Sequence, residues 1–517
     1  MKVSVSLSLS LIIIFILYFL FENYFSFITV DGPAHLYNAR ILEQLIQKDD
    51  FISNYYHHLH EIAPNFFSTY LLFFLNQIFT PIISEKVLIF LLLTHFFIGM
   101  ALILKSISSK PHLFLLLSTP LGLNYLLGFG FYNFLFGINF LLLSIWFYLN
   151  YLKEFKFYYL IGIFLCTALT YLCHGLVFLI EICILTTILS FKIIQDVYNE
   201  KQFRKWYILE YIKVGFIFLP GIYLILDFME LREELNKSYL SNYEIIDFIS
   251  EMRPLILYTH LDRMYAKEYF YIFYGLIAIS TYSWFEQYRP STKKDYFFNS
   301  IWLIIFATLL LSLFFLPDGS SGGSLIIVRI HFLAIVFSIF WISVYDFYKW
   351  FLYGCLLLLF FPLKNSVQEK WKIQKELNLR VNEFLEAERR IDDNSIIFTM
   401  RHSNEWTDGH FSNYLGINKP VLILDNYEAS TGYFPVRFKI NPMNCVSTPF
   451  LFNQEINQFP IKLCHGDSSK VLDYILFYGE APLTAVQQEF LDSTKIYYEN
   501  IYSTERLNLY KLVDKRK

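Results

Sequence analysis

The chain has 517 residues, of which 55% are hydrophobic and only 17% are charged, with 56 phenylalanines and 39 tyrosines. A soluble globular protein carries about 25% charged residues, and here the apolar surplus comes in long runs, which excludes a soluble class and predicts a polytopic membrane protein. The formal net charge of −3 says nothing about partners, and because the basic residues form no patch interleaved with aromatic ones, we expect no nucleic-acid partner.

The first apolar run, Val3 to Phe21, is followed by Glu22, Asn23 and Tyr24 and not by the small residues of a cleavage site. Together with its length, this predicts a retained signal anchor. A membrane-spanning helix needs about 20 predominantly apolar residues. Windows that approach this length fall at 4–27, 85–105, 112–127, 132–152, 157–173, 175–194, 207–227, 269–287, 298–316, 325–344 and 350–362.

The apolar segment 65–79 is short and ends at Thr80-Pro81, so it is either a twelfth span or a helix lying in the interface. The excess of Lys and Arg in cytoplasmic loops decides between these. If 65–79 does not span, every basic cluster falls on the same side of the membrane. If it spans, the first basic cluster lies on the side opposite to the N-terminus, and the clusters no longer follow the rule. We therefore expect eleven spans, a cytoplasmic N-terminus and a multi-pass protein of the inner (cytoplasmic) membrane. The basic clusters are Lys105 with Lys110, Lys153 with Lys156, 192–205, 289–294 and Lys349.

After Lys364 the composition changes from apolar to mixed. The sequence thus divides into a transmembrane domain, 1–362, and an extracytoplasmic α+β domain, 363–517. The second domain is large enough for a core of its own. Its expected elements are an amphipathic helix over 366–390, strands over 395–400, 420–424 and 470–478, and a helix over 484–492.

Two of the six cysteines, Cys445 and Cys464, lie in this polar region. They can pair if the region faces an oxidising compartment, or they remain two free thiols. The other four lie inside apolar runs, where cysteine is most simply a small hydrophobic residue. No cysteine spacing is typical of a zinc or redox motif.

The stretch Thr29–Arg40 places several ionisable side chains directly after the first apolar run. Gly32-Pro33 predicts a turn followed by a short helix, with the proline at its first position and Asp31 as its N-cap. His35 and Asn38 then lie about one and two turns along the same side of that helix. An ionisable cluster at a membrane boundary is a functional hypothesis, and the alternative is a capping carboxylate with interfacial anchors.

His174 lies at the outer end of a predicted helix, and Arg329 lies about one turn inside the outer boundary, after the glycine- and serine-rich loop Pro317–Ser324. A charged arginine at that depth costs a few kcal/mol unless it is paired. The guanidinium fork matches phosphate oxygens, and a glycine-rich loop lets backbone amides approach an anion. We therefore expect a lipid phosphate beside Arg329, and the alternative is an ion pair or hydrogen bond within the protein. For His174 the alternative to a role in binding is a structural role at a helix end.

The order of these features resembles a known class of membrane enzymes. A cytoplasmic N-terminus, one span, an outer loop with an early acidic residue and a non-spanning apolar helix before the second span are similar to polyprenyl-phosphate-sugar-dependent glycosyltransferases of the GT-C class. The stretch Asp31-Gly-Pro-Ala-His-Leu-Tyr-Asn-Ala39 resembles the acidic motif in the first outer loop of their bacterial members. Gly128-Phe-Gly-Phe-Tyr-Asn-Phe134 resembles a second segment met in such proteins.

The resemblance implies a GT-C-like fold and an inverting hexosyl- or pentosyltransferase. In such an enzyme Asp31 is the general base that activates an acceptor hydroxyl, and Arg329 is the cation that meets the leaving phosphate. The donor is a polyprenyl-phosphate-linked sugar, the acceptor is a glycan, a lipid or a protein, and membrane lipids are further partners. The remaining substrate-binding candidates are His35, Asn38, Arg40, Asn133 and His174.

Some members of the class use a divalent metal, for which Asp31 with His35 or His174 is a plausible ligand set. The second outer loop, Tyr125–Asn133, has no carboxylate, whereas the metal-using members carry a second acidic motif there. We therefore expect no metal cofactor.

The C-terminal runs Arg401–His410 and Leu424–Ala429 are dense in polar side chains. Each suits sugar recognition by stacking and hydrogen bonding, or is a loop of a structural domain. Two other functions stay open: a polysaccharide ligase or polymerase, which relies on arginine and histidine in one large outer loop, and a non-catalytic transporter of lipid-linked glycans. Against the transporter, the predicted spans are nearly devoid of ionisable groups and show no inverted repeat.

Overall fold

The structure is a computed structural model that describes residues 4–21, 26–202, 204–230, 237–288, 295–319, 324–439 and 472–513. Cys445 and Cys464 lie outside the described residues. The chain folds into two compact units. Unit 1 comprises Met1–Glu22, Ile62–Pro64 and Phe90–Ile373, and unit 2 comprises Asn23–Glu61, Asn65–Ile89 and Gln374–Lys517.

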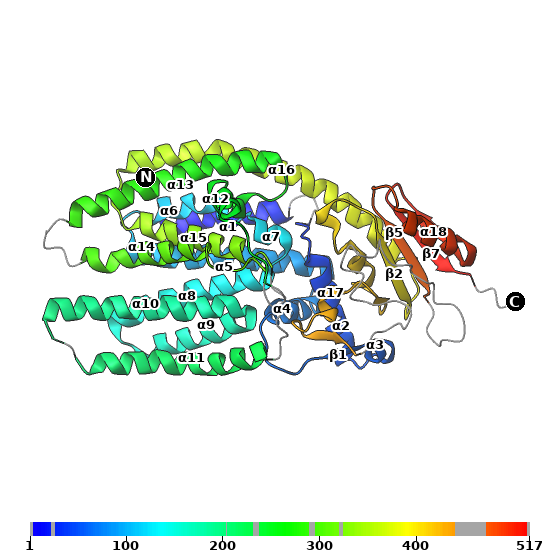
Figure 1. The fold of residues 1–517 in the computed structure, drawn as a ribbon, viewed down its shortest axis with the longest axis horizontal. Helices are drawn as coiled ribbons and strands as arrows, with labels where there is room; N and C mark the ends of the chain where they lie inside the picture. Colours follow the sequence, from blue (N-terminus) through cyan, green and yellow to red (C-terminus); the bar gives the residue numbers. More distant parts are fainter. Residues whose placement is uncertain are drawn as a thin grey trace. The chain divides into compact units, whose positions relative to one another are not determined.

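Unit 1 is a bundle of helices in which α8, α9, α10 and α11 lie side by side (Figure 1). At its centre, every residue of α15 from Ile327 to Ser343 is buried, as expected of a helix that is apolar on all sides. The helices are α1 (Val5–Phe21), α6 (Pro111–Leu117), α7 (Tyr125–Phe129), α8 (Tyr132–Glu154), α9 (Phe157–Cys173), α10 (Gly175–Glu200), α11 (Trp206–Glu230), α12 (Asn242–Ser250), α13 (His260–Tyr288), α14 (Asp295–Ser312) and α15 (Ile326–Ser343), with most of α5 (Pro81–Ile107) and the first part of α16 (Lys349–Glu388).

Six helices of the described residues are long and apolar enough to cross a membrane, namely α5, α8, α10, α11, α15 and α16. The bent pair of α6 and the segment Thr119–Phe129 adds a seventh if it counts as one span. Large apolar side chains on α11 stay exposed, among them Ile208, Phe216 and Tyr223, where a soluble protein would not leave a contiguous apolar face. The chain is therefore a helical membrane protein.

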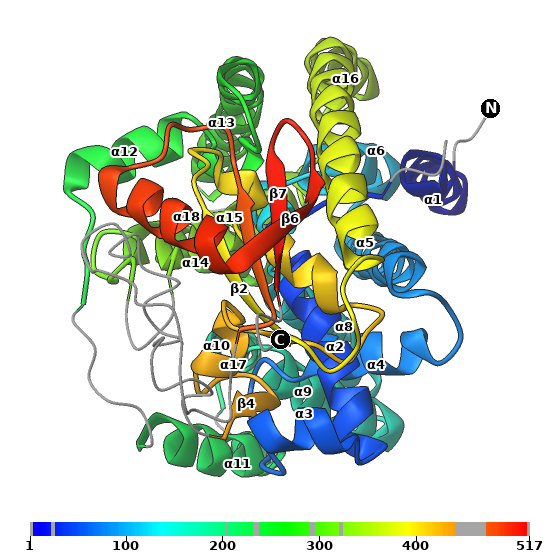
Figure 2. The same ribbon diagram turned by 90° about the vertical axis from the view of Figure 1, so that its right-hand side faces the viewer.

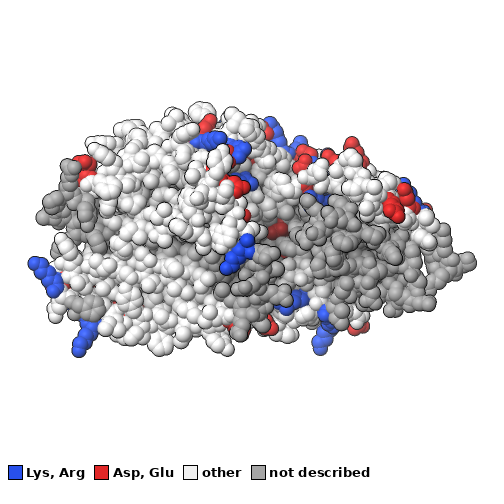
Figure 3. All heavy atoms as spheres, viewed as in Figure 1, with Lys and Arg blue, Asp and Glu red and all other residues white. Residues whose placement is uncertain are grey.

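The distribution of charge on unit 1 agrees with this class. In Figure 3 the surface over α8, α10 and α11 carries very few charged side chains, and Lys and Arg side chains stand at the left-hand ends of α10 and α11. Residues 201–205 join those two ends. Charged groups are thus kept away from the middle of the helices, which is the part that lipid would cover.

The window predicted at 112–127 is not one straight span. Helix α6 ends at Leu117, a turn of 3₁₀ helix follows at Thr119–Leu121, and the two parts are bent by 42°. Pro120 explains the break, because proline has no N–H for the helical ladder and its ring clashes with the preceding turn. Apolar composition alone did not reveal this bend.

Conversely, the elements predicted at 350–362 and 366–390 are one continuous helix, α16, with Pro362 inside it. Membrane helices tolerate such a proline, because neighbouring groups re-satisfy the freed carbonyl. Residues of α16 up to Ile373 belong to unit 1 and those from Gln374 onward to unit 2.

Unit 2 contains a five-stranded sheet of order β3-β2-β5-β7-β6, in which β2 is parallel to β3 and β5, and β7 is antiparallel to β5 and β6 (Figure 2). One face is covered by α18 (Ala485–Tyr497), whose Phe490 packs on Phe398 and Phe477. The other face meets the end of α16, where Phe384 packs on Tyr478. The strands are β2 (Ile396–Arg401), β3 (Leu422–Ile423), β5 (Tyr474–Tyr478), β6 (Tyr498–Ser503) and β7 (Leu507–Leu512).

The segment after the first apolar helix also belongs to unit 2. Its strand β1 (Tyr56–His58) pairs antiparallel with β4 (Val436–Phe438), which lies close to α17 (Tyr427–Ser430). Helix α4 (Phe67–Asn76) has ten residues, a length of about 15 Å. This is half the thickness of a bilayer core, in keeping with the non-spanning helix expected at 65–79. The remaining helices here are α2 (Gly32–Ile46) and α3 (Asp50–Tyr55).

Tyr37 anchors α2 to the sheet. Its side chain is completely buried, its hydroxyl donates to the Val421 carbonyl at 2.6 Å, and the same oxygen accepts from the Ile423 N–H at 3.1 Å. Burial raises the pKa of Tyr37 well above its usual value, so the hydroxyl keeps its proton and remains a donor.

We expect Tyr37→Phe to lower the free energy of unfolding by about 1–3 kcal/mol, because it leaves two buried backbone groups without this partner. The measurement is thermal unfolding of the full chain in lipid nanodiscs. Tyr243→Phe is the control, since Tyr243 is 80% exposed on α12 and its replacement should change stability by no more than about 0.5 kcal/mol. Equal unfolding temperatures for Tyr37→Phe and wild type would contradict the anchor.

Candidate functional site

Asp31 stands at the N-cap position of α2, as predicted, but its side chain makes no capping hydrogen bond. The Gly32 N–H donates instead to Thr29 Oγ1 at 3.1 Å. The predicted capping role of the carboxylate is therefore wrong. Asp31 has the helical backbone angles φ −86° and ψ −11° and not the extended backbone of a capping residue, and Pro33, the second residue of the helix, has no N–H to cap. The Asp31 carboxylate is turned to a different partner.

That partner is His410, whose Nε2 lies 3.5 Å from Asp31 Oδ1. Both side chains are largely buried, with exposures of 8% for His410 and 13% for Asp31. The His410 ring stacks on Tyr427, with centroids 4.4 Å apart. Burial, together with the charges of Arg401 and His35, lowers the pKa of His410 to about 3. The imidazole is thus neutral near pH 7 and does not cancel the charge of the carboxylate beside it.

His35 and Asn38 lie on the same face of α2, as predicted, and both bind Glu428. His35 Nδ1 lies 2.6 Å from Glu428 Oε1, and Asn38 Nδ2 donates to Oε2 at 2.9 Å. Glu428 is completely buried, and a buried carboxylate is costly unless donors surround it. We call Asp31, His35, Asn38, His410 and Glu428 the Asp31 cluster.

A further carboxylate lies at the start of the same helix. Glu85, near the beginning of α5, is 1% exposed, and it packs against Gly32 so closely that a Cβ atom there would overlap its carboxylate. A larger residue there would have to displace the buried Glu85 carboxylate and the Thr29 hydroxyl. The partial positive charge of a helix N-terminus favours nearby anions, which is consistent with two carboxylates at one helix start.

Arg40 has a different environment. Its Nη1 forms an ion pair with Glu43 Oε2 at 2.5 Å, between residues three apart on α2. Such pairs contribute about 0.2–0.5 kcal/mol to a helix. Among the contacts described for Arg40, none is with a member of the Asp31 cluster.

In unit 1 the structure brings Arg329 and His174 together. Arg329 Nη1 lies 2.8 Å from His174 Nε2, and because a guanidinium only donates hydrogen bonds, this histidine nitrogen is the acceptor and carries no proton. The Arg329 guanidinium also lies over the Phe131 ring, 4.2 Å from its centroid, and 5.5 Å from that of Phe134. A cation over an aromatic face is stabilised by about 0.5–2 kcal/mol.

Asn133 is buried in the first turn of α8, between the aromatic residues that contact Arg329. The predicted site residues therefore fall into two groups. Asp31, His35, Asn38 and Arg40 belong to unit 2, and Asn133, His174 and Arg329 belong to unit 1.

Within the described ranges, no group of three or more His, Cys, Asp or Glu side chains is arranged to hold a metal ion. Asp31 with His410, and Glu428 with His35, are pairs of one carboxylate and one imidazole each. A structural or catalytic zinc site needs three or four protein ligands, which neither pair supplies.

Fold and side chains together define a helical membrane protein whose described residues include a buried acid–histidine cluster and an arginine–histidine pair. No known family model and no curated protein matches this chain. Its function therefore has to be inferred from these two groups of residues.

Sequence reasoning did not identify three residues of this site as partners of the first loop. His410 and Glu428 lie in polar runs that the sequence singled out for sugar recognition, but no local pattern connects those runs with Asp31. Glu85 carried a signal that could have been used, because it stands with Lys86 at the start of an otherwise apolar helix. A charged pair at the end of an apolar run is a candidate for function.

The shifted pKa of His410 predicts how unfolding depends on pH. Because its pKa is lower in the folded chain than in the unfolded chain, the unfolded chain binds the extra proton once the pH falls below about 6.5. Stability should therefore fall from about pH 6.5 toward pH 3, with a slope of up to about 1.4 kcal/mol per pH unit from this residue. Thermal unfolding of wild type and His410→Gln between pH 7.5 and 5 measures the difference, and parallel curves would contradict the buried, neutral imidazole.

Proposed function

We propose that the protein is an integral membrane glycosyltransferase that transfers a sugar from a polyprenyl-phosphate-linked donor to a hydroxyl-bearing acceptor, with Asp31 as the general base. The observation that carries the proposal is the state of Asp31. Its carboxylate makes no capping bond, faces a neutral imidazole and is held at a helix start by an otherwise paired cluster. The resemblance of its loop to the acidic motif of the GT-C class adds to this support.

The proposed reaction needs one carboxylate and one cation. The acceptor oxygen attacks the anomeric carbon, its proton passes to Asp31, and the bond from that carbon to the phosphate oxygen breaks with inversion. The electron pair leaves with the phosphate. A hydroxyl is a weak nucleophile until a positioned base takes its proton, a contribution of about 10²- to 10⁴-fold.

His410 suits a positioning role in this proposal. Its neutral ring, fixed by stacking on Tyr427, orients the Asp31 carboxylate without neutralising it. A protonated histidine at the same place would weaken the base, because an adjacent positive charge favours the ionised carboxylate.

Arg329 is the proposed cation for the leaving phosphate. Its guanidinium is held on an aromatic face and against His174, so it is oriented before a ligand arrives, which is the condition for effective charge stabilisation. We further propose that the chain has eleven spans in the inner membrane, with a cytoplasmic N-terminus, a GT-C-like arrangement of the spans and the C-terminal region outside.

A second candidate is a polysaccharide ligase or polymerase that uses the same kind of lipid-linked substrate. The pairing of Arg329 with His174 favours it, because such enzymes rely on arginine and histidine and not on an early carboxylate. The two candidates differ in what they require of Asp31.

Asp31→Asn should lower sugar transfer by about 10²-fold or more, because the amide cannot accept the proton. The measurement is the release of polyprenyl phosphate from a panel of polyprenyl-phosphate sugars by the full chain in nanodiscs. Asp50→Asn, at an exposed position of α3, should leave the rate unchanged. Full activity of Asp31→Asn together with loss of activity in His174→Ala would contradict the glycosyltransferase assignment and favour the ligase.

Arg329→Lys keeps a positive charge but loses the fork that matches two phosphate oxygens. We expect about tenfold weaker donor binding in this variant and a larger loss in Arg329→Ala. Titration with a polyprenyl phosphate measures the affinity. Arg263→Ala is the control, since Arg263 pairs with Glu251 elsewhere in unit 1. If Arg329→Ala binds the donor as tightly as wild type, Arg329 does not bind the donor phosphate.

A further inference from the structure

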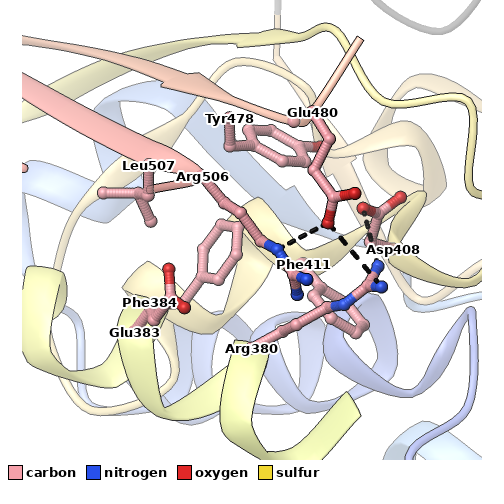
Figure 4. A pocket seen from close by; sticks show the side chains of 10 residues that line it. Arg380, Glu383, Phe384, Asp408, Phe411, Tyr478, Glu480, Arg506 and Leu507 are labelled. Carbon is pink, nitrogen blue, oxygen red and sulfur yellow. Dashed lines mark ion pairs between the residues drawn. The ribbon is translucent and has the colours of Figure 1, made fainter. Parts of the chain in front are cut away.

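Many charged side chains of this protein are paired with one another. Beside the sheet of unit 2, Glu480 Oε1 lies 2.5 Å from Arg506 Nε and 3.8 Å from Arg380 Nη2 (Figure 4). With two arginines and three carboxylates in its lining, the small pocket there has no surplus of positive charge. One end of the helix bundle of unit 1 is different, because its basic side chains outnumber its acidic ones.

This end is made by two connections between helices. The turn from α8 to α9 contains Phe155, and the connection from α10 to α11 leads into Trp206. The two rings meet edge to face with centroids 5.5 Å apart, so the two connections lie side by side. We call Lys153–Lys156, Glu200, Lys201 and Arg204–Trp206 the basic end of unit 1.

The basic end carries more positive charge than its own carboxylates balance. Lys156 Nζ lies 2.6 Å from Glu154 Oε2. Arg204 Nε lies 2.7 Å from Glu200 Oε2. Three exposed lysines remain, which we call the surplus lysines and to which no ion pair joins a described acidic residue: Lys153, Lys201 and Lys205. A surplus of three positive charges is therefore left at this end of the bundle, where Figure 3 shows Lys and Arg side chains standing out from the surface.

Exposed apolar side chains continue from the basic end along α9 and α11, which pack side by side (Figure 1). They include Tyr158, Ile161 and Leu165 on α9 and Ile208, Ile212 and Phe216 on α11. Trp and Tyr are typical of the headgroup level of a bilayer, which is where Trp206 and Tyr158 stand between the charged and the apolar residues. The order of charges, aromatic rings and apolar side chains matches the order of headgroup, interface and hydrocarbon in a bilayer.

This order selects one kind of ligand. A soluble anion such as phosphate would meet the lysines but gain nothing from the apolar side chains. A zwitterionic phospholipid would cover the apolar side chains but bring no net negative charge. An anionic phospholipid satisfies both requirements, because each Lys or Arg near an anionic membrane surface strengthens the attraction about fivefold.

We propose that the basic end of unit 1 binds the headgroup of an anionic phospholipid through the surplus lysines, with the acyl chains of the lipid on α9 and α11. In the proposed topology this end faces the cytoplasm, so the lipid comes from the cytoplasmic leaflet. The site is separate from the proposed sugar transfer, because none of its residues belongs to the Asp31 cluster or contacts Arg329 in the structure.

The test measures binding to the fluorescently labelled full chain in uncharged detergent micelles by microscale thermophoresis. The probes are phosphatidylglycerol, phosphatidylcholine and inorganic phosphate. We expect phosphatidylglycerol to bind about tenfold or more tightly than phosphatidylcholine, and phosphate to leave its binding unchanged. This preference should shrink when salt rises from about 0.1 M to about 1 M, because the screening length falls from about 10 Å to about 3 Å.

Two triple variants lose the same charge at different places. The test variant replaces the surplus lysines: Lys153→Gln, Lys201→Gln and Lys205→Gln. The control variant replaces three exposed lysines of unit 2: Lys375→Gln, Lys439→Gln and Lys495→Gln. We expect the test variant to bind phosphatidylglycerol about tenfold or more weakly than wild type, whereas the control variant should bind it like wild type. Arginine at the three surplus positions keeps the charge and should preserve the affinity.

Several results would overturn the proposal. Equal wild-type affinities for phosphatidylglycerol and phosphatidylcholine would do so, as would wild-type affinity for phosphatidylglycerol in the test variant. An equal loss of affinity in the control variant would show a general effect of net charge and not a site. Competition by phosphate would indicate a site for soluble anions, and a preference that ignores salt would exclude the lysines as its cause.

Discussion

The buried carboxylate of Glu428 is the constraint on which the candidate site depends. It contacts His35 and Asn38, which lie on two successive turns of α2. An ion in the interior without such partners costs several kcal/mol. Helix α2 can neither rotate nor slide without breaking these bonds. Tyr37, one residue before Asn38, adds a second fixed point through the backbone of β3. The start of the helix, and with it Asp31, is held in place from two sides.

This arrangement explains why Asp31 differs from an ordinary capping residue. The backbone of Asp31 is already helical, with φ −86° and ψ −11°, Pro33 offers no N–H to cap, and the space over Gly32 is filled by the Glu85 carboxylate. A capping aspartate is satisfied by the backbone it caps, whereas here the side chain faces a histidine that burial keeps neutral. The local sequence looks like a helix start, and the surrounding structure places its carboxylate among buried imidazole and carboxylate groups.

The sequence alone was sufficient where the pattern is local. A helix start within one residue of Pro33, the shared face of His35 and Asn38 and the strand at Ile396–Arg401 all follow from short-range spacing. It was insufficient where the cause is distant or is a single residue. Asn38 and Glu428 are 390 positions apart, and no periodicity encodes such a contact. Pro120 bends an apolar window that hydropathy shows as continuous. Conversely, the two elements expected over 350–362 and 366–390 are one continuous helix, α16.

One short segment of unit 2 touches both a buried carboxylate and the Asp31 cluster. Arg401 Nε lies 3.8 Å from Asp408 Oδ1, and the charge of Arg401 also helps to keep His410 neutral beside Asp31. This explains why the run Arg401–His410 is rich in polar residues. The same loop pairs Arg401 with the buried Asp408 and positions the His410 imidazole beside Asp31.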